Sequence, residues 1–277
     1  MLKSVLRGKL SDKEIIQLSS SFDVIGDIAI IKIPKELSSK ENLIGEQILG
    51  NVKNVKTVLK QNSDVEGEYR TRNVSLIAGK EKYETIYKES GVSIKVDVRS
   101  VYFSPRLSTE RLRIRSMVKE GEHILNMFAG VGTFSFVIAK TTDCQIESID
   151  KNPEAVRLAL ESIKLNKRLE GNVNPILGDA KEFAESHSGE FDRILMPLPE
   201  RSKDFLKAAV ESSKRNSVAM IHYYVHVPEN QFLEKGWINR HLEGINLGRD
   251  FQVRTWKKVR EVGPRYIQAV ADISLFC

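Results

Sequence analysis

The sequence predicts an α/β protein with a doubly wound, mostly parallel seven-stranded sheet, preceded by a small α+β domain. From residue 122 onward, short apolar runs alternate with helical patterns, which is the arrangement of a mostly parallel sheet. The first run leads into a turn with two glycines, and acidic residues end the next two. In open α/β sheets, ligands bind at the carboxyl ends of the strands, so these turns predict a binding crevice.

Residues 21–100 have the pattern of the small α+β domain, and residues 1–20 form a short extension to which we assign no chemistry. In the extension, Ser11 and Asp12 can cap a helix over residues 13–18. Pro34 ends the first strand of the domain, because proline cannot donate to a sheet ladder. The expected elements are strands over 22–33, 55–60, 69–78, 83–87 and 92–98 and a helix over 39–49.

The segment 99–119 leads into the second domain and is strongly basic, with Glu110 as its only acidic residue. Residues 107–118 are expected to be helical, with Ser108 or Thr109 as the cap. A charge run is usually a solvated helix face, and an acid in a first turn stabilises the helix dipole. A lone carboxylate among arginines also stays ionised, as a general base must. Taken alone, these residues favour the structural interpretation.

The second domain, residues 101–277, contains the alternating pattern. Pro153 follows Asn152 at the start of a helix, where proline is favoured. The last two strands are expected to pair antiparallel at the edge of the sheet. The expected strands are 123–128, 145–149, 173–177, 191–196, 218–226, 253–259 and 266–275, and the expected helices are 133–140, 153–166, 203–214 and 229–244.

Gly130 and Gly132 form the glycine turn between the first strand of this domain and its first helix. Without side chains, they leave backbone amides open to a close-approaching ligand. Asp150 ends the next strand, the usual position of an acid that binds ribose hydroxyls. The third glycine of the dinucleotide fingerprint is missing, so the spacing favours a single nucleoside ligand. The alternative is a tight turn that binds no ligand.

Two further strand ends are expected at the same crevice. Asp179 ends the third strand, and the fourth ends in the run from Pro197 to Glu200. His222, Tyr223 and Tyr224 lie on the fifth strand. We interpret them as core and crevice wall rather than metal ligands, because no second histidine or cysteine has ligand spacing.

Composition and charge indicate an anionic partner. The formal net charge is +6, which makes nucleic acid the leading candidate for that partner. The alternative explanation of the charge is a lysine-rich surface that only keeps the protein soluble. Cys144 and Cys277 form no metal or redox motif, so a reducing, cytoplasmic setting is expected. The chain opens with no signal-peptide pattern, and no run of about 18 apolar residues could span a membrane.

Several stretches together resemble a known family, the class I S-adenosylmethionine-dependent tRNA (guanine-37, N1)-methyltransferases of archaea and eukaryotes, which have a Rossmann-like fold. The resemblance runs from about residue 22 to the end, and SPRLSTER ahead of FAGVG is its most diagnostic part. One archaeal branch also methylates a tricyclic wyosine precursor. The wyosine-pathway aminocarboxypropyl transferases share much of the FAGVG region and remain an alternative. The matching stretches are EGEYRTRNVSLIAG, VYFSPRLSTERLRI, NMFAGVGTF, SIDKNPEAV, LNK, LGDA, LMPLPE and IHYYV.

The resemblance implies S-adenosylmethionine as the cofactor. It implies that Asp150 binds the ribose hydroxyls, that Asp179 and the Ala180 amide hold the adenine, and that Phe128 lies in the floor of the site. The residues it places at the cofactor are Arg111, Phe128, Gly130, Gly132, Asp150, Asp179, Ala180 and Pro197.

The resemblance also implies the chemistry. A sulfonium methyl is already activated, so no metal is required, but guanine N1 must lose its proton first. Glu110 matches the proposed general base of the family. Arg70 matches the arginine proposed to stabilise charge on guanine O6, and Arg72 is the alternative if the match is shifted by two positions. Both arginines could instead be outward residues of an edge strand. The expected partner is the anticodon stem-loop of tRNA, with the target base turned out of its stack, and the enzyme is expected to be a monomer. The expected substrate contacts are Arg72, Arg106, Pro197, Leu198 and Pro199.

Two positions depart from the family pattern. Asn126 replaces the usual aspartate at the start of the first motif, and Pro197 replaces the asparagine of Asn-Leu-Pro. Proline lacks the side-chain amide and the backbone N–H, so base recognition is affected more than methyl transfer. The altered motif fits the wider substrate range of the branch that acts on the wyosine precursor. A third alternative is a non-catalytic RNA-binding protein of the same fold.

Overall fold

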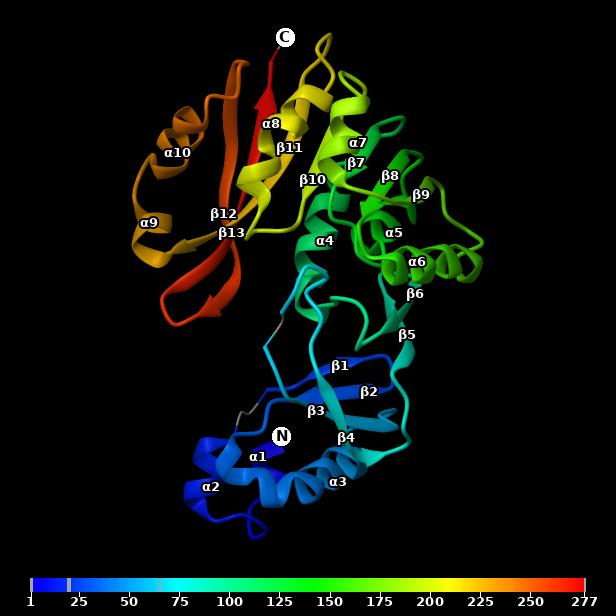
Figure 1. Ribbon diagram of the computed structural model, residues 1–277, viewed down its shortest axis with the longest axis vertical. Coiled ribbons are helices and arrows are strands. Elements are labelled where there is room, and N and C mark those ends of the chain that lie inside the picture. Colours follow the sequence, from blue (N-terminus) through cyan, green and yellow to red (C-terminus); the bar gives the residue numbers. More distant parts are fainter. Residues whose placement is uncertain (1, 19–20, 65, 277) are drawn as a thin grey trace. The chain divides into compact units, whose positions relative to one another are not determined.

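The computed structural model describes residues 2–18, 21–64 and 66–276. The chain forms two compact units (Figure 1). The first consists of Met1–Arg106 and Arg157–Leu165, and the second of Leu107–Val156 and Asn166–Cys277. Cys277, one of the two cysteines noted above, lies outside the described residues.

The first unit contains a four-stranded sheet of order β1-β2-β3-β4, with one parallel pair, β2 and β3. The strand expected over 22–33 is instead a hairpin of two short strands, because the chain turns at Gly26 and Asp27. Gly26 has φ +58°, and a Cβ there would lie 2.2 Å from the Thr85 Oγ1 atom, so this turn requires glycine. The strands are β1 Asp23–Ile25, β2 Ile28–Ile31, β3 Thr57–Gln61 and β4 Val74–Gly79.

Helices cover this sheet and complete its core. The 3₁₀ helix η1, Lys35–Lys40, and α3, Glu41–Asn51, connect the parallel strands β2 and β3. Near the N-terminus, α1 is Leu2–Val5 and α2 is Asp12–Gln17, the latter capped by Ser11 as expected. Buried leucines of residues 2–18 pack in one core with strand and helix residues of the unit. A separate hairpin, β5 Glu84–Glu89 and β6 Val92–Asp97, follows β4.

The second unit contains the predicted seven-stranded sheet, of order β12-β13-β11-β10-β7-β8-β9. Strands β7 to β11 pair in parallel with one another, which confirms the doubly wound prediction. The last two strands are antiparallel at the edge, also as predicted, with β13 between β11 and β12. The strands are β7 His123–Asn126, β8 Gln145–Asp150, β9 Asn172–Leu177, β10 Arg193–Met196, β11 Ala219–Pro228, β12 Phe251–Gly263 and β13 Tyr266–Leu275.

The helices of this sheet differ from the expectation in three places. Helix α7 was not expected, because only three of its seven residues are apolar. The helix expected over 229–244 is two helices, interrupted at Gly236, which has φ +78°. The cap of α4 is Leu107 rather than Ser108 or Thr109, and it makes no side-chain capping bond. The helices are η2 Pro105–Leu107, α4 Ser108–Arg115, α5 Thr133–Ala139, α6 Pro153–Leu165, α7 Ala180–Ser186, α8 Ser202–Ser212, α9 Glu229–Leu233 and α10 Trp237–Ile245.

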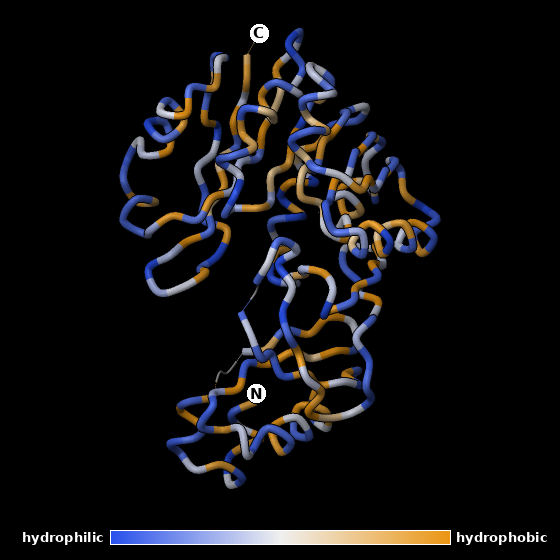
Figure 2. Tube along the Cα trace, viewed as in Figure 1, coloured by the Kyte–Doolittle hydropathy of each residue, from blue (hydrophilic) through white to orange (hydrophobic). Residues whose placement is uncertain are grey.

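Side-chain alternation gives the strand β11 two different faces. Tyr223, Val225 and Val227 belong to the apolar core that also includes residues of α8 and α10. His222 and Tyr224 alternate to the other face and are also fully or nearly fully buried. The backbone trace in Figure 2 is apolar along much of the central sheet, in agreement with this core. None of the described helices is both long and apolar enough to cross a membrane.

Candidate active site

The glycine turn lies directly after β7 and shapes the start of α5. Gly130 has φ 55° and Gly132 has φ 77°, in the left-handed region that favours glycine. The Gly130 amide donates to the Asp150 Oδ2 atom at 2.6 Å, and the Ala129 amide donates to the Ile149 carbonyl at 2.9 Å. The end of β8 therefore holds the turn that follows β7.

Asp150, the last residue of β8, is a largely buried hydrogen-bond acceptor at the carboxyl end of that strand. Its Oδ1 atom accepts a second bond from the Asn152 amide at 2.9 Å. Burial raises the pKa of the Asp150 carboxyl above its usual value, and the two amide bonds offset part of that effect. Each oxygen accepts one hydrogen bond from the described residues, which leaves each a second lone pair. That geometry suits a pair of vicinal ribose hydroxyls.

Asp179 begins α7 and caps it. Its Oδ1 atom accepts from the amides of Lys181 at 2.7 Å and Glu182 at 3.2 Å, and its Oδ2 atom lies 2.7 Å from the Lys151 Nζ atom. Burial would raise the pKa of Asp179, but the Lys151 and amide hydrogen bonds lower it below its usual value. Asp179 is therefore an ionised acceptor beside the buried Ala180.

The end of β10 leads into the run Pro197–Pro199. The Leu198 carbonyl accepts from the Arg201 amide and from Ser202, so it is engaged in starting α8. Pro197 and Leu198 are partly exposed, whereas Pro199 is buried. The Phe128 ring packs edge-on against Phe205 of α8, with centroids 4.9 Å apart. This fixes Phe128 beside the fourth strand end.

Asn126 lies under the glycine turn and is fully buried. Its Nδ2 atom donates to the Ser135 Oγ atom at 3.1 Å, and Ser135 lies 2.7 Å from the Ser148 hydroxyl on β8. The amide therefore joins β7, α5 and β8. This contact supports the interpretation that position 126 orients the turn.

Glu110 lies in the first turn of α4, with only 5% of its surface exposed. Arg113, one turn along the same helix, donates from Nε to Oε2 at 2.8 Å and from Nη2 to Oε1 at 2.7 Å. Tyr224 of β11 donates its hydroxyl to Oε1 at 2.7 Å. Burial, followed by the nearby Glu110 charge and this hydrogen bond, raises the pKa of Tyr224 far above its usual value, so the phenol stays a donor.

Because Tyr224 binds Glu110, the position of Tyr224 shows that Glu110 lies near the carboxyl edge of the sheet. Tyr223 pairs with Met196, the last residue of β10, so Tyr224 lies one position beyond that strand end. The Tyr224 ring also meets Phe134 of α5 edge-on, with centroids 6.3 Å apart. Phe134 is two residues after Gly132. The buried carboxylate and the glycine turn therefore share neighbours at the edge where ligands bind in such sheets.

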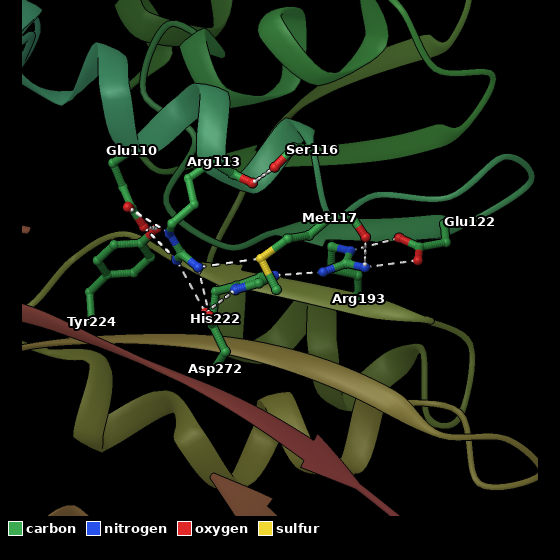
Figure 3. A network of polar contacts seen from close by, with 9 residues as sticks. All are labelled: Glu110, Arg113, Ser116, Met117, Glu122, Arg193, His222, Tyr224 and Asp272. Atoms are coloured by element: carbon green, nitrogen blue, oxygen red, sulfur yellow. Dashed lines mark hydrogen bonds and ion pairs between the residues drawn. The ribbon is translucent and has the colours of Figure 1, made fainter. Parts of the chain in front are cut away.

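Beyond Glu110 the polar contacts continue across the sheet (Figure 3). Arg113 also binds Asp272 of β13, which in turn contacts His222 of β11 at 2.6 Å. The His222 Nε2 atom lies 2.7 Å from Arg193, and Arg193 pairs with Glu122 at 2.6 Å. The sequence predicts His222 and Tyr224 as residues of the core and the crevice wall. They are buried, but they also carry this network.

Two signals in the sequence point to this network. One is a polar residue on every second position of an apolar strand, as in Ile221 to Tyr224. The other is a single acid in an apolar run, Asp272. Neither signal identifies the partners, which come from four elements.

Three more of the predicted residues, all arginines, lie in the first unit. Arg70 has φ 54° in a turn before β4, and its guanidinium lies over the Tyr102 ring, 4.4 Å from the centroid. Arg72 is buried and donates to the Phe103 carbonyl at 2.8 Å. Both arginines precede β4, so they are not outward residues of that edge strand. Arg106 is half exposed and pairs with Asp23 at 2.7 Å.

Arg111 is buried on α4, with 2% of its surface exposed. In the described ranges, no group of three or more His, Cys, Asp or Glu side chains could hold a metal ion.

The chain is similar to known proteins along almost all of its length. It is 43% identical over 278 residues to the tRNA (guanine(37)-N(1))-methyltransferase Trm5b of Pyrococcus abyssi, covering 98% of this chain and 79% of that protein. It is 35% identical to the tRNA 4-demethylwyosine(37)-methyltransferase Taw21 of Saccharolobus solfataricus, covering 98% and 99%. It is 28% identical to a tRNA(Phe) (4-demethylwyosine(37)-C(7)) aminocarboxypropyltransferase of Pyrococcus horikoshii, covering 99% and 96%.

Solved structures agree with these similarities. The complex of aTrm5 and tRNALeu superposes with a TM-score of 0.84 at 31% identity, covering 99% of this chain and 77% of that one. The Methanocaldococcus jannaschii TYW2 in complex with AdoMet superposes with a TM-score of 0.67 at 26% identity, covering 92% and 99%. Family profiles match the TYW2 N-terminal domain at residues 2–82 and the TRM5/TYW2 methyltransferase domain at residues 85–246. The chain therefore belongs to the TRM5/TYW2 methyltransferase family.

Proposed function

We propose that this protein transfers a methyl group from S-adenosylmethionine to N1 of guanosine 37 in tRNA. One observation carries the proposal: a buried carboxylate, Glu110, is held by Arg113 and Tyr224 at the same sheet edge as the glycine turn. The 43% identity to a tRNA (guanine(37)-N(1))-methyltransferase supports this reaction and cofactor.

The residues at the strand ends would hold the cofactor. Asp150 would accept the ribose hydroxyls on the free lone pairs of its two oxygens, and Asp179 with the Ala180 amide would hold the adenine. Phe128 and the glycine turn would form the floor, with Pro197 and Arg111 beside it. When bound, the cofactor supplies a sulfonium methyl group that needs no further activation. The protein must then align the acceptor with it, which can supply several kcal/mol of the barrier reduction.

Glu110 would remove the N1 proton. The Oε2 atom accepts one hydrogen bond, from Arg113, so a second lone pair on this oxygen is left among the described residues. The proton would pass from N1 to Oε2, leaving negative charge shared by N1 and O6, and an arginine would stabilise this charge. The N1 electron pair would then form the new bond to the methyl carbon, while the bond between that carbon and sulfur breaks and leaves its electron pair on sulfur.

Arg70 is our candidate for that arginine. A non-glycine residue with positive φ stores backbone strain, which clusters at functional sites, and Tyr102 orients the guanidinium. Arg72 is the weaker candidate, because its guanidinium is buried and already bound to a backbone carbonyl.

The substrate would be the anticodon stem-loop of tRNA, bound by a monomer. The small domain, residues 21–100, would contact the stem, with Arg106 meeting phosphates and Leu198, Pro197 and Pro199 lining the base site. The reaction would take place in the cytoplasm. Burial raises the pKa of the Cys144 thiol to about 12, which suits a protein with no need of thiol chemistry.

The test is transfer of labelled methyl from S-adenosylmethionine to unmodified tRNA with guanosine at position 37, with an adenosine-37 transcript as the control. We expect label only in the first tRNA, and nucleoside mass analysis should give 1-methylguanosine. Normal cofactor binding without any transfer would refute the proposal and favour a non-catalytic RNA-binding protein.

A second candidate reaction is methylation of 4-demethylwyosine at the same position. Pro197, in place of the family asparagine, and the 35% identity to a 4-demethylwyosine methyltransferase over nearly its full length favour it. Transfer to tRNA that already carries 4-demethylwyosine would establish this activity. A much larger added mass would indicate transfer of an aminocarboxypropyl group instead, the reaction named for the Pyrococcus horikoshii relative.

A further inference from the structure

Arg113 is shared between two carboxylates of the second unit (Figure 3). Its Nε and Nη2 atoms donate to Glu110, and its Nη1 and Nη2 atoms donate to Asp272 at 2.6 and 3.2 Å. Nη1 also lies 3.3 Å from the Met117 Sδ atom. A guanidinium has five N–H donors, and these contacts use all five. One positive charge therefore faces two negative charges.

Asp272 cannot move away from Arg113, because it is fixed from the sheet. It is fully buried on β13, opposite His222 of β11 in the strand register, and the two side chains lie 2.6 Å apart. Arg193 can only donate, so the His222 Nε2 atom must be the acceptor, and Nδ1 must carry the hydrogen that Asp272 accepts. His222 is thus a neutral imidazole that orients the Asp272 carboxylate.

Sharing the Arg113 guanidinium between two carboxylates affects how readily Glu110 can accept a proton. If Arg113 paired only with Glu110, the full positive charge would stabilise the ionised carboxylate and make it a poor proton acceptor. A second carboxylate on the same guanidinium reduces that stabilisation while keeping Glu110 in place. We propose that Asp272 is a positioning residue of the reaction, which holds Arg113 on two carboxylates and thereby keeps Glu110 both oriented and basic.

This inference rests on the proposed function, because it assigns a proton-accepting role to Glu110. The charged and titratable groups around Glu110 within the second unit are Arg111 and Arg113 on α4, Tyr224 and His222 on β11, and Asp272 on β13. Helix α5, which packs against α4, contributes none, since Thr133–Ala139 contains no titratable side chain.

Two substitutions should move the pH profile in opposite directions. Asp272→Asn leaves the Arg113 charge to Glu110 alone, so the acidic limb of the methyl-transfer rate should move to lower pH by about one unit. The plateau should fall roughly threefold to tenfold, because the base is weaker. Tyr224→Phe removes a hydrogen bond to the ionised carboxylate, so the limb should move to higher pH.

The measurement is single-turnover methyl transfer to guanosine-37 tRNA between pH 4 and 9, with cofactor affinity measured in parallel. Asp192→Asn is the matched control: like Asp272, Asp192 pairs with a cation, Lys214, and accepts a second hydrogen bond, here from the His123 amide, but no contact among the described residues links it to Glu110. Its profile should match that of the wild type.

Four outcomes separate the possibilities. Opposite shifts with unchanged cofactor affinity support the role of Asp272. Folded variants that lose rate with no shift, or that shift the same way, would show that Asp272 only stabilises the fold and would overturn the inference. If Asp272→Asn does not fold, Tyr224→Phe and Arg113→Lys decide it, since lysine lacks the planar five-donor fork that spans both carboxylates, and this change should move the limb as well. A wild-type protein without transfer would instead refute the proposed function.

Discussion

We propose different tasks for two carboxylates of the second unit, Glu110 and Asp150, because their surroundings differ. Glu110→Gln keeps the size of the side chain and removes the proton acceptor. Turnover should fall by roughly 10²- to 10⁴-fold, the usual contribution of a general base, with nearly normal cofactor affinity. Asp150→Ala should weaken cofactor binding instead, because it removes the acceptor for the ribose hydroxyls. Calorimetry and single-turnover rates measure the two effects, and equal behaviour of both variants would refute the separate roles.

His222 should make the fold sensitive to acid. Burial, together with the positive charges of Arg193 and Arg113, lowers the pKa of His222 below its usual value, despite the opposing effect of Asp272. An unfolded histidine binds a proton below about pH 6.5, whereas the folded one stays neutral there. The free energy of unfolding should therefore fall as pH drops below about 6.5, by up to ~1.4 kcal/mol per pH unit from this group.

The matched variant is His222→Gln, whose amide can still donate to Asp272 and accept from Arg193. Urea unfolding at several pH values should show a shallower decline for the variant than for the wild type. Parallel curves for the two proteins would contradict this account of His222.

At the scale of residues, contacts between neighbouring parts of the chain could be predicted from the sequence, whereas contacts made across the sheet could not. Gly130, Gly132 and Asp150 were recognisable because a strand, a turn and the next strand end follow one another in the chain. The Arg113–Asp272 pair joins residues 159 positions apart, and only the strand order brings them together. A polar residue in an apolar strand signals that a partner exists, but the sequence does not say which.

At the scale of elements, the turn into α5 depends on the left-handed conformation of Gly132. Gly132→Ala should cost about 1–2 kcal/mol of stability, because a Cβ is disfavoured at φ 77°, and the distorted turn should bind the cofactor less tightly. Gly50→Ala is the control. Gly50 lies in α3 with no atom within 4 Å of an added Cβ, so alanine should leave the stability unchanged or raise it by about 0.5–1 kcal/mol. Denaturant midpoints of both variants measure the difference, and equal losses would contradict it.

The elements that the sequence predicted well are those whose pattern is long or buried. The parallel strands, and their alternation with helices along the chain, could be predicted from continuous apolar runs. Such runs are typical of strands covered on both faces. The hairpin at Gly26 and Asp27 was merged into one strand because both arms are apolar and only a two-residue turn separates them. Helix α7 was missed because only Ala180, Phe183 and Ala184 of its seven residues are apolar, whereas α5, of the same length, is mostly apolar and follows the glycine turn.

At the scale of the whole molecule, the relation of the chain to its relatives does not by itself select the modified atom. The family includes proteins that methylate guanine N1 and others that act on 4-demethylwyosine, and this chain is similar to both. The fold and the cofactor edge are common to these chemistries, so fold-level similarity cannot separate them. The residues that face the base must do so, and we propose Pro197, one of the two departures from the family pattern, as one of them.

The net charge of +6 leads to a prediction for the substrate that does not depend on which base is modified. Each phosphate neutralised by a lysine or arginine releases counterions, so the affinity for tRNA should fall by at least roughly tenfold between 50 and 200 mM salt. Affinity for S-adenosylmethionine should change little over the same range, because the acceptors at the strand ends are partly buried and less screened. Filter binding of tRNA and calorimetry of the cofactor at matched salt concentrations test both statements. A tRNA affinity that is insensitive to salt would show that phosphate contacts, including the one proposed for Arg106, contribute little to recognition.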